Sequence, residues 1–247
     1  NTHVPETTEV SGTKTWNDNN NQDGIRPESI VVNLYANGTF KESQTVTEQT
    51  EWKYTFENLD KFEKGIEIQY TVQEEVVEGY STEIKGYDIT NSYTPGQTSR
   101  TVTKIWDDNN NQDGIRPTEI RVQLMANGKE TGEEVILNEA NSWTYTWDDL
   151  PEKAAGKTID YQVKEVGEVK GYTTSYIEDT FIITNSHAPE KTKVDVEKEW
   201  KDLGEGYRPE SITVRLYADG EEIKTIQMTK ENGWKYTFEN LDKYKDG

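Results

Sequence analysis

The chain has 247 residues, with 27 basic and 47 acidic side chains and a net charge of −20. This charge argues against binding to nucleic acid or to an anionic membrane, because both repel an acidic protein. The chain has no cysteine, which excludes disulfide bonds and thiolate metal sites. It also has no apolar run of membrane-spanning length, no signal peptide and no wall-sorting motif, so we expect a piece of a longer protein or a soluble chain.

The first part of the chain alternates apolar and polar residues in several short segments. This period of two is typical of half-buried β-strands. An Asn37-Gly38 pair favours a tight hairpin turn, and no segment shows a helical stripe. Many short strands separated by turn signals predict an antiparallel β-sandwich. In chain order the predicted strands cover residues 10–16, 30–35, 52–56, 66–74 and 89–91.

The same pattern begins three times. Lys14, Lys104 and Lys198 each stand two residues before a tryptophan, and they are spaced 90 and then 94 residues apart. Each of these lysines follows an asparagine by 13 residues, in turn Asn1, Asn91 and Asn185. The spacing of the repeat is therefore kept across the junctions. We therefore expect an all-β chain of tandem antiparallel β-sandwich modules. The expected domains are 1–7 (end of a preceding module and linker), 8–95 (module 1), 96–188 (module 2) and 189–247 (N-terminal part of a module 3).

Three polar residues of each complete module fall on the strand face that is predicted to point inward. Lys14 lies on the inward face of the first strand, Glu74 follows Val72 in the same parity, and Asn91 follows Ile89 in the same way. The second module repeats the set with Lys104, Glu165 and Asn185. Each module is thus expected to direct one amine, one carboxyl group and one amide into its core.

Burial of this trio permits covalent chemistry. Apolar surroundings lower the pKa of a lysine and raise that of a glutamate, so both groups can become neutral. A neutral amine is a nucleophile, and a protonated carboxyl group can donate to the amide oxygen and help ammonia leave. The product would be a Lys-Asn isopeptide bond, formed without an external catalyst because the fold supplies proximity. A buried Lys-Glu pair with Asn as hydrogen-bond partner is the alternative, and the pattern alone leaves both open.

Several motifs resemble those of one known family. From Lys104 to Pro117 the chain reads Lys-x-Trp-Asp-Asp-Asn-Asn-Asn-Gln-Asp-Gly-x-Arg-Pro. A Tyr-x-Val-x-Glu motif ends at Glu74, and an Ile-Thr-Asn-Ser motif contains Asn91. With the recurring Trp-x-Tyr-x-Phe/Trp segments, these motifs resemble the Cna B-type domains of Gram-positive surface adhesins and pilins over nearly the whole chain.

The resemblance implies an inverse immunoglobulin-like sandwich with a spontaneous isopeptide bond in each complete module, and it favours the cross-link over a plain ion pair. Lys198 matches the family lysine, and Asn1 matches the family asparagine, but neither has its partners in this chain. We expect both to stay unpaired. The residues carried over by position are Lys14 with Asn91, assisted by Glu74, and Lys104 with Asn185, assisted by Glu165.

By the same resemblance, we expect a structural stalk of a cell-wall-anchored adhesin on the surface of a Gram-positive bacterium, projecting a ligand-binding region. The expected partners are neighbouring modules of the chain, and host extracellular matrix through a separate domain; no membrane insertion is expected in this segment. The alternative is that the modules themselves bind a host matrix protein or a glycan. Turnover catalysis is not expected, because the two histidines, His3 and His187, lack a nucleophile pattern. No cofactor is expected.

The Asn-rich loop of each complete module imitates the start of a calcium loop. Asn19, Asn21 and Asp23 place oxygen atoms at alternate positions before a glycine, but position twelve is Ile30 instead of glutamate. We favour a solvated turn, although the pattern leaves calcium binding by these loops open. We expect Arg26, at the end of the loop, to hold it by hydrogen bonds. Residues 109–120 repeat this arrangement.

Overall fold

The computed structural model describes residues 4–203 and 205–247. Within these residues the regular structure consists of β-strands and short 3₁₀ helices, η1 to η3, which confirms the predicted all-β fold class. Contacts group the chain into two compact units. The first comprises Asn1–Thr101, Leu124–Gly132 and Thr146–Val163, and the second comprises Val102–Gln123, Glu133–Tyr145 and Lys164–Gly247.

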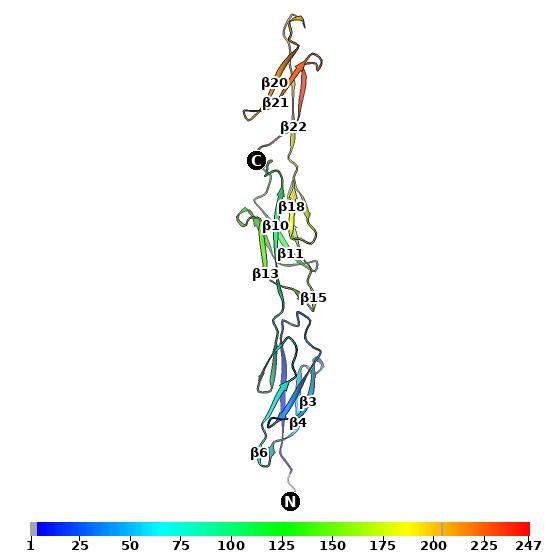
Figure 1. Ribbon diagram of the computed structural model, residues 1–247, viewed down its shortest axis with the longest axis vertical. Coiled ribbons are helices and arrows are strands. Elements are labelled where there is room, and N and C mark those ends of the chain that lie inside the picture. Colours follow the sequence, from blue (N-terminus) through cyan, green and yellow to red (C-terminus); the bar gives the residue numbers. More distant parts are fainter. Residues whose placement is uncertain (1–3, 204) are drawn as a thin grey trace. The chain divides into compact units, whose positions relative to one another are not determined.

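The first repeat, residues 7–92, forms two sheets and a small hairpin (Figure 1). One sheet has the strand order β4-β1-β9-β8, the other has the order β3-β2-β7, and β5 pairs with β6. The elements are β1 (Thr7–Asn17), β2 (Ser29–Ala36), β3 (Thr39–Thr47), η1 (Glu48–Thr50), β4 (Lys53–Asp60), β5 (Phe62–Glu63), β6 (Ile66–Glu67), β7 (Tyr70–Glu74), β8 (Ser81–Lys85) and β9 (Asp88–Ser92).

The core of the first repeat is built from alternate residues of both sheets. Val10 in β1, Tyr54 in β4 and Leu34 in β2 are buried in one cluster. Successive side chains on a strand point to opposite faces, so the residues between them face outward. The hairpin of β2 and β3 turns at Asn37 and Gly38, whose φ angles are 50° and 80°, as the Asn-Gly pair predicts.

One pairing differs from the predicted antiparallel arrangement. β1 and β9 run parallel, with Lys14 opposite Ile89 and Trp16 opposite Asn91. The other pairings that involve the two sheets of this repeat are antiparallel. The strands that enter and leave the repeat are therefore neighbours, which puts Lys14 and Asn91 on adjacent strands.

The strand predicted over residues 66–74 is interrupted. Ile66 belongs to the β5–β6 hairpin and is 74 % exposed, whereas Val72 in β7 is buried. The hairpin turns at Lys64 and Gly65, which both have positive φ, so the alternation does not run unbroken from Ile66. Glu74, at the end of β7, keeps the inward parity that the sequence predicts.

The second repeat, residues 97–186, has sheets of order β13-β10-β18-β17 and β12-β11-β16, with a small β14-β15 hairpin. β10 and β18 again run parallel, with Lys104 opposite Ile183 and Trp106 opposite Asn185. The elements are β10 (Gln97–Asp107), β11 (Glu119–Ala126), β12 (Lys129–Asn138), η2 (Glu139–Asn141), β13 (Thr144–Pro151), β14 (Lys153–Ala154), β15 (Lys157–Thr158), β16 (Tyr161–Val166), β17 (Thr173–Tyr176) and β18 (Ile182–Ser186).

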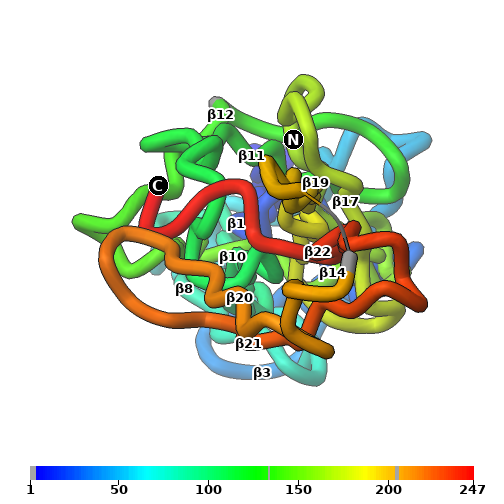
Figure 2. Tube along the Cα trace, turned by 90° about the horizontal axis from the view of Figure 1, so that it is seen from above, coloured from blue at the N-terminus to red at the C-terminus, as the bar shows by residue number. Residues whose placement is uncertain are grey.

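The third repeat begins at residue 191. β19 pairs antiparallel with β22, and β20 pairs with β21, which lies beside it in both views (Figures 1 and 2). Met228 and Phe238 are fully buried within it. Its elements are β19 (Lys191–Glu197), η3 (Glu205–Tyr207), β20 (Ser211–Ala218), β21 (Glu221–Thr229) and β22 (Lys235–Asp242).

Candidate functional site

The predicted trio of the first repeat lies in its core. Lys14 in β1 is 3 % exposed and Asn91 in β9 is 0 % exposed. Glu74 reaches the site from β7 in the opposite sheet, and its Oε1 lies 3.2 Å from Nζ of Lys14. Both amide atoms of Asn91 are buried, and neither has a hydrogen-bond partner among the described residues. A buried amide without a partner is uncommon and costly, by about 1–3 kcal/mol.

The second repeat brings the same three groups into direct hydrogen bonds. Nζ of Lys104 donates to Oε2 of Glu165 over 3.2 Å, and Nδ2 of Asn185 donates to Oε1 of the same carboxyl group over 3.0 Å. Lys104 and Asn185 are 4 % and 0 % exposed. The two oxygens of Glu165 therefore join the amine to the amide.

The orientation of the Asn185 amide differs from the arrangement expected from sequence. We expected the carboxyl group to donate to the amide oxygen, whereas the amide nitrogen faces Glu165 and Oδ1 has no partner among the described residues. A carboxylate only accepts hydrogen bonds, so an amide N–H is the group that suits it. A proton on Glu165 would sit beside the nitrogen that leaves in a substitution at Cγ.

An aromatic wall covers the amine in the first repeat. Nζ of Lys14 lies 4.2 Å from the ring centroid of Trp16. Trp16 in turn meets Trp52 and Tyr80 edge to face, with centroid separations of 5.2 and 5.0 Å. Burial lowers the pKa of Lys14 to about 8, although Glu74 acts in the opposite direction. The second repeat has the same wall, and burial lowers the pKa of Lys104 to about 8 as well.

Sequence reasoning missed two parts of this wall. Trp52 was predicted to begin a strand, but it has a positive φ of 57° after η1, and β4 starts at Lys53. Tyr80 was not singled out, because it lies between strands and follows no alternation. The recurrence of a Gly-Tyr pair at Gly79 and Gly171 was the signal that could have revealed it.

The Asn-rich loop is held by its own side chains. Arg26 donates from Nε and Nη2 to the two oxygens of Asp18, and Tyr80 donates to Asp18 over 2.8 Å. The hydrogen bonds from Arg26 lower the pKa of Asp18 to about 2. Oδ1 of Asn21 accepts from the backbone N–H of Arg26 over 3.0 Å. The expectation that Arg26 fixes the loop by hydrogen bonds is confirmed, and Arg116 does the same for Asp108.

The last acidic residue of each loop holds the segment that follows the repeat. Oδ2 of Asp23 accepts from the Tyr93 hydroxyl over 2.8 Å and from the Gly96 backbone over 3.0 Å. Asp113 is bound in the same way by Nε2 of His187 and the backbone of Glu190, over 2.9 and 2.8 Å. Among the described residues no three acidic or histidine side chains cluster as a metal site.

Comparison with known proteins identifies the repeats. The family model of the Cna protein B-type domain matches residues 10–92, 100–186 and 194–247, which is most of the chain. The chain belongs to the Cna B-type domain family. Over its full length it is 52 % identical to a collagen adhesin of Staphylococcus aureus, but it spans only 21 % of that protein.

Solved structures of Cna B repeats are similar to this chain. The crystal structure of two B repeat units of the collagen-binding protein of Staphylococcus aureus is 51 % identical, with a TM-score of 0.58, and the match covers 98 % of this chain and 66 % of the other. The structure of a single B repeat unit from the same protein is 53 % identical, with a TM-score of 0.37, and covers 74 % of this chain and all of the other. The chain thus consists of Cna B-type repeats like those of a surface adhesin.

The third Cna B-type repeat presents its lysine differently. Lys198 follows the end of β19, is exposed, and has its Nζ 4.9 Å from the ring centroid of Trp200. Asn1, the other residue expected to stay unpaired, lies outside the described residues.

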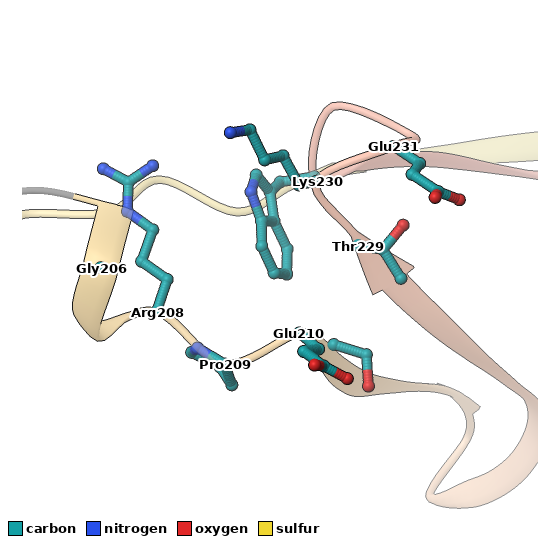
Figure 3. Close-up of a pocket in the computed structure, with 9 residues that line it drawn as sticks. Gly206, Arg208, Pro209, Glu210, Thr229, Lys230 and Glu231 are labelled. Atoms are coloured by element: carbon teal, nitrogen blue, oxygen red, sulfur yellow. The ribbon is translucent and has the colours of Figure 1, made fainter.

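A cavity of about 980 Å³ lies beside Trp234 and is lined by Arg208 and Lys230 (Figure 3). Lys198 is not among its lining residues, but its backbone N–H donates to the carbonyl oxygen of Trp234 over 2.9 Å.

No helix within residues 4–203 and 205–247 is long and apolar enough to span a membrane.

Proposed function

We propose that each complete repeat is locked by an isopeptide bond, between Lys14 and Asn91 in the first and between Lys104 and Asn185 in the second. The observation that carries this proposal is the position of Glu165, whose two oxygens contact the amine and the amide nitrogen at 3.2 and 3.0 Å. Such a group can move protons between nucleophile and leaving group without leaving its place. Glu74 has the corresponding role in the first repeat, where it lies 3.2 Å from the amine of Lys14.

The reaction balances without any further reactant. The carboxylate of Glu165 takes a proton from the Lys104 ammonium, and the neutral amine then attacks Cγ of Asn185. The Nζ–Cγ bond forms and the Cγ–Nδ2 bond breaks as the carboxyl group of Glu165 returns this proton to Nδ2, which departs as ammonia. A second proton from Nζ remains on Glu165, which leaves a neutral carboxyl group beside a neutral amide.

The unpartnered groups in the first repeat support the same reaction. Both amide atoms of Asn91 are buried without a hydrogen bond among the described residues, whereas Nζ of Lys14 is paired with Oε1 of Glu74 at 3.2 Å. A structure that needed these groups only for stability would leave them at a cost of about 1–3 kcal/mol each. The cross-link removes two amine protons and the amide nitrogen, and so reduces the number of buried donors that lack a partner.

The bond would give the repeats a mechanical role. β1 and β9 are the first and last strands of their repeat, and they lie side by side. Tension along the chain enters through one and leaves through the other, so a covalent link between them carries the load past the rest of the fold. A bond of this kind resists extension as a disulfide does, and does not depend on redox conditions.

From these features we infer a stalk in a cell-wall-anchored adhesin on the outer surface of a Gram-positive bacterium. The collagen adhesin that the chain resembles is about five times longer, because the chain spans 21 % of it. In this proposal another part of the protein binds host matrix, and the repeats project that part from the cell. The domains are those expected from the repeat, 8–95, 96–188 and the third from 189, each with its neighbours as partners.

Intact mass measured under denaturing conditions tests the cross-links. Each bond releases one ammonia, so the wild-type chain is expected to lack the mass of two. Glu74→Gln is expected to retain one of these ammonia molecules, and Glu75→Gln, at the next and exposed position, to behave as wild type. Fragment spectra should join peptides that contain Lys14 and Asn91. A wild-type chain of full unreacted mass would overturn the proposal.

A further inference from the structure

A threonine from a neighbouring strand contacts the same carboxyl group in both complete repeats. Oγ1 of Thr82 donates to Oε2 of Glu74 over 3.0 Å. Oγ1 of Thr174 lies 3.5 Å from Oε2 of Glu165, an oxygen that also accepts from Lys104. We infer that Thr82 and Thr174 are positioning residues for the isopeptide reaction; this inference rests on the proposed function.

Strand register explains why the threonine stands there. Thr82 in β8 is directly opposite Asn91 in β9, and Thr174 in β17 is directly opposite Asn185 in β18. Directly opposed residues of an antiparallel pair extend to the same face of the sheet. The hydroxyl and the reacting amide therefore approach the glutamate from one side, as a cross-strand pair.

The hydroxyl does something that the other partners of the carboxyl group cannot do. Within the part of the chain that the structure describes, the side-chain donors to the Glu165 carboxyl group are Lys104, Asn185 and Thr174. During the reaction Lys104 loses protons and forms a new bond, and Asn185 loses its amide nitrogen. Thr174 alone keeps its covalent structure, so its hydrogen bond can hold the carboxyl group while the other two contacts change.

The threonine and the lysine share the carboxyl group differently in the two repeats: in the first, Lys14 contacts Oε1 of Glu74 and Thr82 contacts Oε2. In the second repeat Thr174 and Lys104 both contact Oε2, and this leaves Oε1 to Asn185. In both arrangements the hydroxyl bond restrains rotation of the carboxyl group, which would turn its oxygens away from the groups they contact. Preorganised contacts of this kind speed a reaction by holding reacting atoms at near-bonding distance.

The test follows the cross-linking rate in the full chain. The protein is made by cell-free synthesis, samples are quenched in acid at intervals, and intact mass reports the loss of each ammonia. Thr174→Val removes the hydroxyl at nearly constant volume and is expected to slow the second bond about fivefold, which is what one lost hydrogen bond of about 1 kcal/mol gives. Thr82→Val is expected to slow the bond of the first repeat in the same way.

Two further variants separate positioning from a general effect on folding. Thr174→Ser restores the hydroxyl and is expected to recover most of the rate. Thr173→Val changes the neighbouring position of β17, which is exposed and points to the other face, and should leave the rate unchanged. Thermal unfolding of the fully reacted proteins checks that the folds are alike.

The outcomes distinguish this inference from the proposed function. If the wild type loses two ammonia molecules and Thr174→Val loses them equally fast, the positioning role is wrong and the cross-link stands. A serine variant as slow as the valine variant would also overturn the role of the hydroxyl. If the wild type loses no ammonia at all, the proposed function fails, and the positioning role fails with it.

Discussion

Nζ of Lys14 lies 4.2 Å from the ring centroid of Trp16, two residues along the same strand. The relationship recurs between Lys104 and Trp106 at 4.7 Å. The tryptophan therefore covers one side of the buried amine in both complete repeats, whereas the same contact at 4.9 Å in the third repeat leaves Lys198 exposed. An indole face attracts a cation, but it cannot replace the hydration that the amine has lost, and so the lysine pKa stays low.

Replacing Trp16 should test this shielding. Trp16→Ala removes a large ring that packs on Trp52 and Tyr80, and is expected to destabilise the first repeat by about 3–5 kcal/mol. Water would reach Lys14, and its pKa should rise back toward the usual value. Trp16→Phe keeps an aromatic face and should have a smaller effect. Thermal unfolding gives the loss of stability, and an alanine variant as stable as the wild type would contradict the packing role.

The rate of cross-linking should depend on the ionisation of the lysine. Lys14 has a pKa lowered to about 8 by burial, so the fraction of neutral amine rises as the pH increases through about 8. Bond formation in the full chain is therefore expected to speed up over this range. An ordinary lysine would still be almost fully protonated there. Quenched time courses at several pH values measure the rate, and a rate that falls between about pH 6 and about pH 8 would rule out attack by the amine.

The stability of the segment that follows the second repeat should depend on the protonation of His187. Its Nε2 and Nδ1 lie 2.9 Å from a carboxylate oxygen of Asp113 and 2.8 Å from the carbonyl oxygen of Gly171, so both nitrogens need a proton to donate. The hydrogen bond to Asp113 raises the pKa of His187. The contribution to stability is therefore complete below the unfolded pKa of about 6.5, and is lost as pH rises through the raised folded value.

Amide hydrogen exchange can detect this change. The backbone N–H of Glu190 donates to Asp113, so its protection should decrease once His187 loses its proton. The Gly96 amide is the matched control, because it donates to Asp23 beside a tyrosine, Tyr93, which does not titrate in this range. His187→Tyr should remove the pH dependence. Equal pH profiles for the two amides in the wild type would contradict the prediction.

Two glycines with similar backbones should tolerate alanine very differently. Gly24 and Gly38 have φ angles of 70° and 80°, so alanine strains both by roughly 1 kcal/mol. A Cβ on Gly24 would also lie 2.6 Å from Cα of Gly156, whereas nothing lies within 4 Å of one on Gly38. Gly24→Ala should thus cost more, and should expose the Gly156 amide, which donates to Gln22. Equal melting temperatures for the two variants would argue against this contact.

The sequence predicted the parts of the site that follow a strand period. Lys14, Glu74 and Asn91 were assigned to the core because alternation passes through each of them, and all three side chains are buried. Alternation failed where the chain turns: Ile66 is exposed because a hairpin interrupts the predicted strand. Tyr80 lies outside any strand, so period alone could not reveal that it covers Trp16.

Contacts between strands could not be predicted in the same way. The parallel register that sets Trp16 opposite Asn91 depends on which strands become neighbours, and a single strand pattern does not specify this. The hydrogen bond from Thr82 to Glu74 also depends on the assembled fold, because the two residues lie in different sheets. The amide orientation of Asn185 responds to the carboxyl group beside it, which only the assembled core provides.

The parallel neighbours β1 and β9 have a consequence for damaged protein. If Lys14 and Asn91 are joined, the peptide between them becomes a closed covalent ring that includes the exposed Asn37-Gly38 turn. A protease that cuts once inside the ring opens it without releasing either end, so a nicked repeat still connects the segments before and after it. Only a cut outside the rings, such as between Asn91 and Lys104, would sever the molecule.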